Sequence, residues 1–403
     1  KVSIQILIME EMNSPAGRTE RQPEGYLAFM PSTLPPALTA PGQDDLLAIT
    51  HATEIVGRLA GTAARLPNPD LFVAMYVRKE AILSSRIEGI ESTLDEILDY
   101  ERDEADREGP ADPADRIAQV VNYVRAARLG AERIGPAAPI TLALIRELHA
   151  VLMHGARNEG GSPAGQFRDT QNWIGPRGSS PFDARYVPPP AARMQLALGN
   201  LAHYINEQPG IPVLIRCAIA HAQFETIHPF HDGNGRLGRL LIPLILRKYG
   251  ALPQPLLYLS LFLLAHRQEY YDRLTLVRSR GDWMGWLRFF CEAVRLTGED
   301  ALATIARVEA LQATIRAKAQ DFPPSARALA ETTFDNPVLS ANSAMKLIGS
   351  SFPTAQGALQ RLVEAGVLVE TTGKRRNKRY RFTTYIEILG AAGENAPGFG
   401  MPG

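Results

Sequence analysis

The chain has 403 residues, a length typical of two or three domains. It carries 43 Lys and Arg residues against 43 Asp and Glu residues, so its formal net charge is zero and no overall field draws it to nucleic acid or to an acidic membrane. Its two cysteines, Cys217 and Cys291, exclude a disulfide framework and a Cys-rich zinc module. Both lie in apolar helical patterns that are typical of buried free thiols.

The hydropathy pattern argues against membrane insertion. No run reaches the roughly 18 consecutive apolar residues that a membrane span needs. The apolar patch from Val2 to Met9 runs directly into Glu10 and Glu11 without a small-residue cleavage site, so we expect no signal peptide. We therefore expect a cytoplasmic protein with no membrane partner.

The first third of the chain is predicted to be an arm followed by helices. Residues 1–43 are rich in Pro, Ser and Thr and predict an extended arm. Helical periodicity begins at Asp44 and defines a region at 44–135, with a second helix over Leu71–Glu88. The charged stretch Glu101–Arg116 is typical of a solvated loop.

The middle of the chain continues the helical pattern, which makes the body mainly α. We expect a core at 136–297 and a linker helix at 298–320. Between helices, the Gly- and Pro-rich residues 155–190 predict a surface loop or hairpin. The expected helices lie at 116–134, 141–154, 191–207, 211–226 and 235–249, and more follow through 260–320.

Residues 321–390 differ in character and predict a winged-helix domain. The pattern indicates three helices and then two strands around a basic turn. The helices are expected at Ser325–Phe334, Ala341–Ile348 and Pro353–Ala365, and the strands at Val367–Glu370 and Tyr380–Thr383. The Gly- and Pro-rich tail at 391–403 is predicted to be disordered.

The stretch His228-Pro-Phe-His-Asp-Gly-Asn-Gly-Arg-Leu-Gly-Arg239 concentrates the chemistry-bearing residues. Two glycines flank Asn234 where a long helix is expected to begin, and the N–H groups of a helix N-terminus make an anion site. Arg236 and Arg239 share one face of that helix and suit a polyphosphate. Asp232 can hold Mg²⁺ against phosphate oxygens, and His228 has the near-neutral pKa of a general base. Together these residues indicate nucleotide chemistry on a phosphoryl group, whereas a tight polar turn with solvated arginines is the plainer alternative.

This stretch resembles the Fic family pattern His-Pro-Phe-x-Asp/Glu-Gly-Asn-Gly-Arg-x-x-Arg at every specified position. The resemblance extends from about Gly25 to Phe382 and implies a mainly α fold: a Fic-type helical core with a β-hairpin flap at about 165–190, followed by the winged helix. Most Fic enzymes transfer AMP from ATP to a Ser, Thr or Tyr hydroxyl of a protein. The resemblance therefore implies ATP as substrate, a protein with a hydroxyl side chain as partner, and a homodimer.

The same resemblance assigns roles to individual residues. His228 would deprotonate the target hydroxyl, and Asp232 would hold Mg²⁺ on the α- and β-phosphates. Arg236 would contact the β-phosphate and Arg239 the γ-phosphate. The implied nucleotide-binding set is Glu88, Gln223, His228, Pro229, Phe230, His231, Asp232, Gly233, Asn234, Gly235, Arg236, Arg239 and Tyr270.

Upstream of the core, Ser84-Ser-Arg-Ile-Glu88-Gly89 resembles the family's inhibitory motif Ser/Thr-x-x-x-Glu-Gly/Asn. Glu88 would pair with Arg239, so that the γ-phosphate loses its arginine. A polar helix end is the plainer interpretation of this short motif. Some family members use the same glutamate to remove AMP from a modified protein, and the sequence does not separate the two activities.

The basic residues of the C-terminal region leave a further function open. They could contact DNA phosphates, or they could simply be solvated on a domain used for protein contact. This possible nucleic-acid wing consists of Lys374, Arg375, Arg376, Lys378 and Arg379. The leading interpretation is an autoinhibited AMP transferase acting on itself and on a target. The alternatives are an enzyme that removes AMP from a protein and a nucleotide-sensing, DNA-binding regulator.

Overall fold

The computed structural model describes residues 11–64, 69–105, 116–136, 138–156, 162–207, 210–373 and 378–390. The predicted disordered tail, the apolar N-terminal patch and most of the charged stretch at 101–116 lie outside these ranges. The described part is mainly helical, as the sequence predicts. Within it, no helix is both long enough and apolar enough to span a membrane.

The N-terminal region contains a small sheet where the sequence analysis expected an extended arm. Three strands, β1 (Asn13–Ser14), β2 (Gly17–Arg21) and β3 (Leu27–Pro31), form an antiparallel sheet in that order. On its outer edge, the Phe29 N–H donates to the Val187 carbonyl at 2.9 Å. The arm is therefore folded back onto the predicted flap. Its strands are too short and too irregular in polarity to show the alternation that reveals a strand in sequence.

Helices α7 (Val213–Ile227) and α8 (Asn234–Lys248) form the centre of the body. They pack against each other, and most residues of both helices are buried, including charged ones such as Arg216 and Arg239. The surrounding helices are α1 (Gln43–Ala63), α2 (Pro69–Ile87), α3 (Leu94–Ala105), α4 (Arg116–Arg133), α5 (Leu142–Leu152), α6 (Ala191–Glu207), α9 (Ser260–Ala265) and α10 (Arg267–Arg280). Cys217 and Cys291 are buried free thiols, as predicted.

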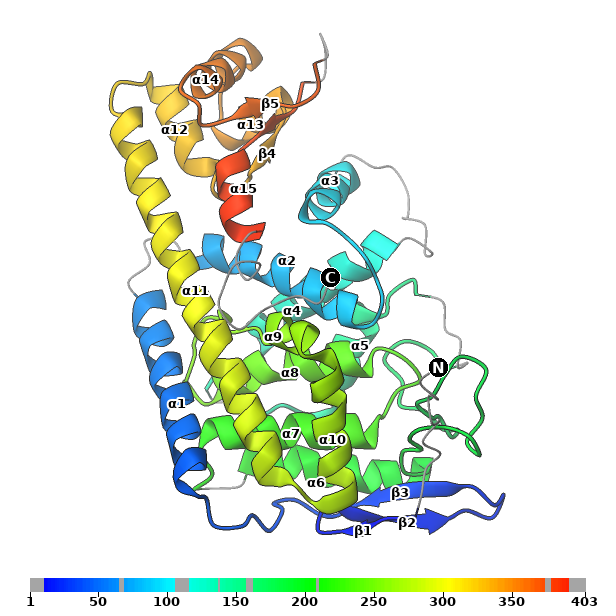
Figure 1. The fold of residues 1–403 in the computed structure, drawn as a ribbon. Helices are drawn as coiled ribbons and strands as arrows, with labels where there is room; N and C mark the ends of the chain where they lie inside the picture. The colour runs from blue at the N-terminus through cyan, green and yellow to red at the C-terminus, as the bar shows by residue number, and fades with distance from the viewer. Residues whose placement is uncertain are drawn as a thin grey trace, which may run out of the picture.

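The long helix α11 (Trp283–Ala319) connects the body to the C-terminal region (Figure 1). It runs through the expected boundary between core and linker at residues 297 and 298 without a break, with α1 packed beside it. Buried residues continue along the helix, from Trp286 to Ala319, so the linker is part of the packed structure.

The C-terminal region forms a compact unit at the far end of α11 (Figure 1). Its strands make a three-stranded antiparallel sheet in the order β4-β6-β5, one strand more than the sequence analysis expected. The elements are α12 (Pro324–Thr332), β4 (Val338–Leu339), α13 (Ala341–Leu347), α14 (Phe352–Glu364), β5 (Val369–Glu370), β6 (Tyr380–Arg381) and α15 (Thr383–Gly390). The winged-helix assignment stays a prediction.

Candidate active site

The loop between α7 and α8 turns at two left-handed residues. His228 ends α7 with φ 48°, and it is the one residue other than glycine with positive φ in the part of the chain that the structure describes. Gly233, at φ 78°, begins α8, and a Cβ there would lie 2.8 Å from Met153 Sδ. The Asn234 side chain closes the loop, since its amide donates to the Phe230 carbonyl and accepts from the Phe230 N–H. The loop is therefore held in shape by its own residues.

His149 on α5 contacts and supports this loop, and the sequence analysis did not single it out. Its ring stacks on Phe230 with centroids 3.6 Å apart. The Gly165 N–H donates to Nδ1 at 2.9 Å, so Nε2 carries the proton that points at the Asp232 carbonyl 3.0 Å away. Burial lowers the pKa of His149 to about 4, which keeps the ring neutral. His149 thus connects the start of the predicted flap to the loop.

Two polar side chains of the flap, those of Arg168 and Asn172, hold the loop through hydrogen bonds. The buried Arg168 guanidinium donates through Nε to the His228 carbonyl at 3.0 Å, and the Arg168 N–H donates to the Pro229 carbonyl. Asn172 donates to the Phe230 carbonyl at 2.8 Å. The expected β-hairpin is reduced to one antiparallel bridge between Ile174 and Tyr186. The flap is therefore fastened by side chains more than by strand pairing.

His228 is poised as a neutral imidazole. Burial lowers its pKa to about 3, with further lowering by the nearby guanidinium groups of Arg168 and Arg278. The Glu225 carbonyl and the Asp232 carboxylate oppose this shift. A neutral ring nitrogen can accept a proton, but a pKa of about 3 makes His228 a weaker base than the near-neutral pKa that the sequence analysis expected, because the folded chain buries the ring among cations.

Arg236 is a buried cation whose hydrogen-bonding capacity is only partly used. The residue is 1% exposed, and its Nε and Nη1 find no hydrogen-bond partner among the described residues. Its Nη2 lies 3.2 Å from Met153 Sδ and 3.6 Å from Asp232 Oδ2. Since a buried guanidinium with two unpartnered nitrogens is costly, this arrangement favours an anion at the start of α8.

Arg239, one turn further along α8, is held by the last turn of α2 and by the residue that follows it. Its Nη2 donates to Glu88 Oε1 at 2.7 Å and to the Ser84 carbonyl, and its Nε donates to Ser84 Oγ. Burial alone would lower the pKa of Arg239, but the facing carboxylate of Glu88 raises it above its ordinary value. Gly89 follows at φ 83° and lets the chain turn away. The structure therefore brings Ser84 and Glu88 to Arg239, as the resemblance implied.

The Glu88 carboxylate also covers the start of α8. A Cβ at Gly235 would collide with Glu88 Oε1 and would lie 3.0 Å from Arg239 Nη1. A second carboxyl, that of Glu225 on α7, interacts electrostatically with Arg239, and burial raises its pKa to about 7. Its Oε1 has no hydrogen-bond partner among the described residues. Arg239 thus faces one bonded carboxylate and one buried carboxyl that titrates near neutrality.

Asp232 is the exposed carboxylate of the loop, and its side chain is 63% exposed. It lies beside Arg236, at the edge of the glycine turn. Within the described ranges, no group of three or more His, Cys, Asp or Glu side chains is arranged to hold a metal ion. One carboxylate beside a phosphate site is nevertheless a donor set that suits Mg²⁺, which binds through one or two carboxylates together with substrate phosphates and water.

The remaining predicted residues contact other parts of the protein. Gln223 donates to the Ser32 carbonyl at 3.1 Å, and the Tyr270 hydroxyl lies 2.9 Å from His221 Nε2 in the core. His231 Nε2 lies 3.3 Å from Thr170 Oγ1. A role for Gln223 and Tyr270 in nucleotide binding stays a prediction, because protein groups engage both side chains in this structure.

Of the predicted basic wing, Lys374, Arg375 and Arg376 lie outside the described residues. Lys378 pairs with Glu370 at 3.9 Å, and Arg379 with Asp99 of α3 at 3.3 Å.

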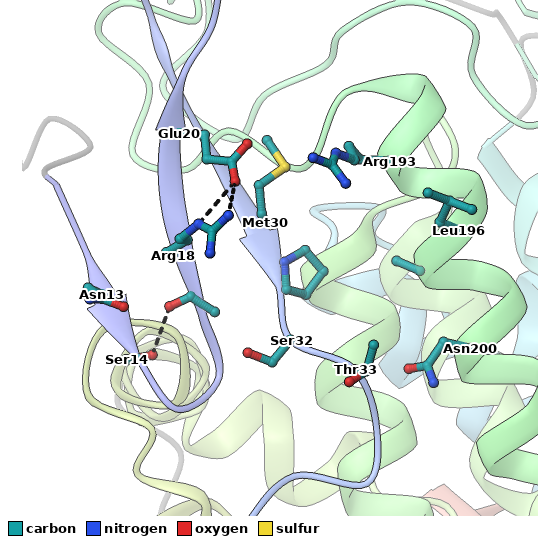
Figure 2. Close-up of a pocket in the computed structure, with 13 residues that line it drawn as sticks. Asn13, Ser14, Arg18, Glu20, Met30, Ser32, Thr33, Arg193, Leu196 and Asn200 are labelled. Carbon is teal, nitrogen blue, oxygen red and sulfur yellow. Dashed lines mark hydrogen bonds and ion pairs between the residues drawn. The ribbon is translucent and has the colours of Figure 1, made fainter.

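A separate cavity of about 500 Å³ lies between the N-terminal sheet and α6 (Figure 2). Arg18, Glu20, Met30, Arg193 and Leu196 line it, and Arg18 is paired with Glu20. None of the residues 228–239 lines this cavity. The α7–α8 loop, with its buried arginines, is therefore the better candidate for chemistry.

Comparison with known protein families agrees with this choice of site. The Fic/DOC family model matches residues 139–246, which include the whole loop, and the Fic/DOC family N-terminal model matches residues 46–132, which include Ser84 and Glu88. The chain thus contains a stretch that matches the Fic/DOC family and, before it, a stretch that matches the N-terminal region of that family. The two matches cover the elements that bring Arg239 and Glu88 together.

Curated relatives of this chain are named as adenylyltransferases. "Probable protein adenylyltransferase aq_aa38" of Aquifex aeolicus is 28% identical over 181 residues, which are 45% of this chain and 51% of that protein. "Protein adenylyltransferase Fic" of Culex quinquefasciatus is 32% identical over 161 residues, which are 39% of this chain and 28% of that protein. The chain thus spans about half or less of the length of the curated relatives it matches.

A solved structure shares the fold. The crystal structure of a Fic family protein from Desulfovibrio desulfuricans superposes with a TM-score of 0.53 at 22% identity, over 85% of this chain and 97% of that chain. The likeness supports a Fic-type, mainly helical architecture.

Proposed function

We propose that this chain is a protein adenylyltransferase that moves AMP from ATP to a Ser, Thr or Tyr hydroxyl of a protein, and that Glu88 restrains it. The observation that carries the proposal is Arg236, a buried guanidinium with unpartnered N–H groups at the glycine-flanked start of α8. Such a group is stabilised by a phosphate. Relatives named as protein adenylyltransferases supply the reaction class.

The residues of the loop would divide the work between positioning and proton transfer. The N–H groups from Gly233 to Gly235 and the Arg236 guanidinium would hold the α- and β-phosphates. The neutral His228 imidazole would take the proton of the target hydroxyl, whose oxygen bonds to the α-phosphorus. The bond from that phosphorus to the bridging oxygen breaks, and pyrophosphate leaves. The catalytic gain comes from orientation and charge stabilisation.

Asp232 would supply one oxygen ligand to a magnesium ion bound with ATP. When bound, the ion would neutralise phosphate charge and favour the departure of pyrophosphate. The exposed position of Asp232 at the loop edge leaves its carboxylate accessible for this role. A partner hydroxyl would reach His228 along the flap, and a homodimer and cytoplasmic location remain predictions from the resemblance and the sequence.

Glu88 would act as the brake. In this structure it holds Arg239, the residue to which the resemblance gives the γ-phosphate. ATP could then bind only with its γ-phosphate displaced and its α-phosphate wrongly presented to the target hydroxyl. The carboxylate that overlies Gly235 also favours a second candidate activity, since it could orient a water molecule for removal of AMP from a modified protein.

The experiment compares three purified forms incubated with α-labelled ATP and Mg²⁺: the wild-type chain, Glu88→Gly, and Glu88→Gly combined with His228→Ala. We expect strong label on the protein only in Glu88→Gly. Absence of label in every form, although ATP binds by calorimetry, would refute the transferase. Release of AMP from a modified protein by the wild-type chain, lost in Glu88→Gly, would assign the second activity.

A further inference from the structure

Strand β6 and the residue that precedes it present two arginines on one side. Arg379 and Arg381 are two residues apart and therefore project to the same face of the strand, while Tyr380 between them is buried on the opposite face. β6 is the middle strand of its sheet, so this face lies at the centre of the C-terminal unit. Its guanidinium groups form a small basic surface, which we call the β6 basic face.

Helix α3 covers the β6 basic face with two carboxylates. Asp95 bonds to Arg381, and Asp99 Oδ2 lies 3.3 Å from Arg379 Nη1. Four residues of a helix rise about 6 Å, and two residues of a strand advance about 6.6 Å. The two spacings match, so both ion pairs form at once.

The covering helix belongs to the body and is attached to the brake. α3 begins at Leu94, only six residues after Glu88. Its Glu101 accepts two bonds from Arg78 of α2, at 2.8 and 2.6 Å. Because α2 carries Ser84 and ends immediately before Glu88, a movement of α3 acts directly on the segment that holds Arg239.

The ion pairs on the β6 basic face are suited to exchange. All four side chains keep between a quarter and a half of their surface exposed, and exposed ion pairs are weak and sensitive to salt. A phosphate matches the guanidinium fork as well as a carboxylate does. In the same C-terminal unit, the exposed residues of α14 include Thr354, Gln356 and Gln360, which are uncharged groups able to contact base edges.

We propose that the β6 basic face binds the phosphates of double-stranded DNA in competition with α3, and that DNA which displaces α3 loosens Glu88 from Arg239. DNA binding stands independently of the reaction. The coupling to Glu88 rests on the proposed function.

The first test measures binding of the full chain to a fluorescein-labelled 20-base-pair duplex by anisotropy, from 50 to 200 mM salt. Asp95→Asn with Asp99→Asn should tighten binding by about 2- to 30-fold, because DNA no longer has to break two exposed ion pairs. Arg379→Gln with Arg381→Gln should abolish most binding, and the slope of log K against log salt should fall by about 2. Circular dichroism would verify that the variants fold.

The matched control is Glu292→Gln with Glu299→Gln on α11. These residues form an equally exposed carboxylate pair on Arg295, so the control makes the same change in net charge far from β6. The proposal is overturned if the control variant increases the affinity for DNA as much as the α3 variant does. It is also overturned if the α3 variant binds no DNA at 50 mM salt, or if a duplex RNA of equal length binds more tightly than the DNA.

The second test measures labelling by α-labelled ATP with and without the duplex. DNA should stimulate the wild-type chain and leave Glu88→Gly unchanged, because that variant has no brake to release. If Glu88→Gly is active but DNA does not stimulate the wild-type chain, the coupling is refuted. If no form is labelled, the proposed function has failed while the anisotropy result still decides DNA binding.

Discussion

The contact between Glu88 and Arg239 allows the strength of the brake to be worked out and measured. Glu88→Gln keeps an acceptor oxygen but removes the charge, whereas Glu88→Gly removes both. Losing one partner of a fully buried ion pair costs about 3–5 kcal/mol. Because the Glu88 side chain is 35% exposed and Ser84 still accepts two bonds from Arg239, we expect a smaller loss of about 1–2 kcal/mol in the free energy of unfolding for Glu88→Gly.

The same change should strengthen ATP binding. A released Arg239 can make a charge-assisted hydrogen bond to the γ-phosphate, which contributes about 1.5–3 kcal/mol and corresponds to about 10- to 150-fold in Kd. The assay is calorimetric titration with ATP and Mg²⁺ in a His228→Ala background, which prevents turnover. Affinity should increase in the order wild type, Glu88→Gln, Glu88→Gly.

ADP is the matched control ligand, since it lacks the γ-phosphate. Its affinity should change far less than that of ATP across the series. Equal gains for ADP and ATP would refute the reasoning, because Glu88 would then obstruct the site as a whole rather than withhold Arg239. Thermal unfolding of the three ligand-free proteins measures the stability cost separately.

Three further predictions concern the loop. Burial, together with Arg168 and Arg278, holds the pKa of His228 near 3, so the ring stays neutral as pH falls and kcat/KM of Glu88→Gly should not decline near pH 6.5 through protonation of His228. Arg278→Gln should raise this pKa and so shift the acid-side decline of kcat/KM to higher pH. An unchanged pH profile in Arg278→Gln would contradict the part assigned to Arg278. Glu225, with a pKa near 7, ionises as pH rises and competes for Arg239, so ATP affinity should fall from pH 6 to pH 8 in calorimetry, but not in Glu225→Gln. His149→Phe keeps the stack on Phe230 but loses two hydrogen bonds, so kcat should drop about 5- to 150-fold with little change in KM, and the melting temperature should fall; an equal rise in KM would instead indicate a role in binding.

The local features of the site could be predicted from the sequence. Residues 228–239 predict a glycine turn followed by a helix, and the structure turns at Gly233 and begins α8 at Asn234. The reason is that these features depend only on residues close together in the chain. They are the positive φ at Gly233, the exposed N–H groups at the start of α8, and the shared helical face of Arg236 and Arg239. The mainly helical class follows equally from periodicity within each segment.

The supports of the site were decided only by the tertiary structure. His149 and Arg168 occur in segments with no distinctive motif, and their hydrogen bonds reach 83 and 60 residues along the chain. Contacts between such distant residues depend on how helices and flap pack, which periodicity does not specify. The N-terminal sheet shows the same limit, since two- and five-residue strands carry too little pattern to be recognised before their partners are known.

The brake lies between these two cases. The motif of Ser84 and Glu88 is visible in the sequence, but only through its resemblance to a family pattern, because nothing local connects it to a residue 151 positions away. The folded chain supplies that connection by packing α2 against α8. The ion pairs of α3 with β6 had no sequence signal at all, since opposite charges 280 or more residues apart have no preferred partner until the C-terminal unit docks on the body.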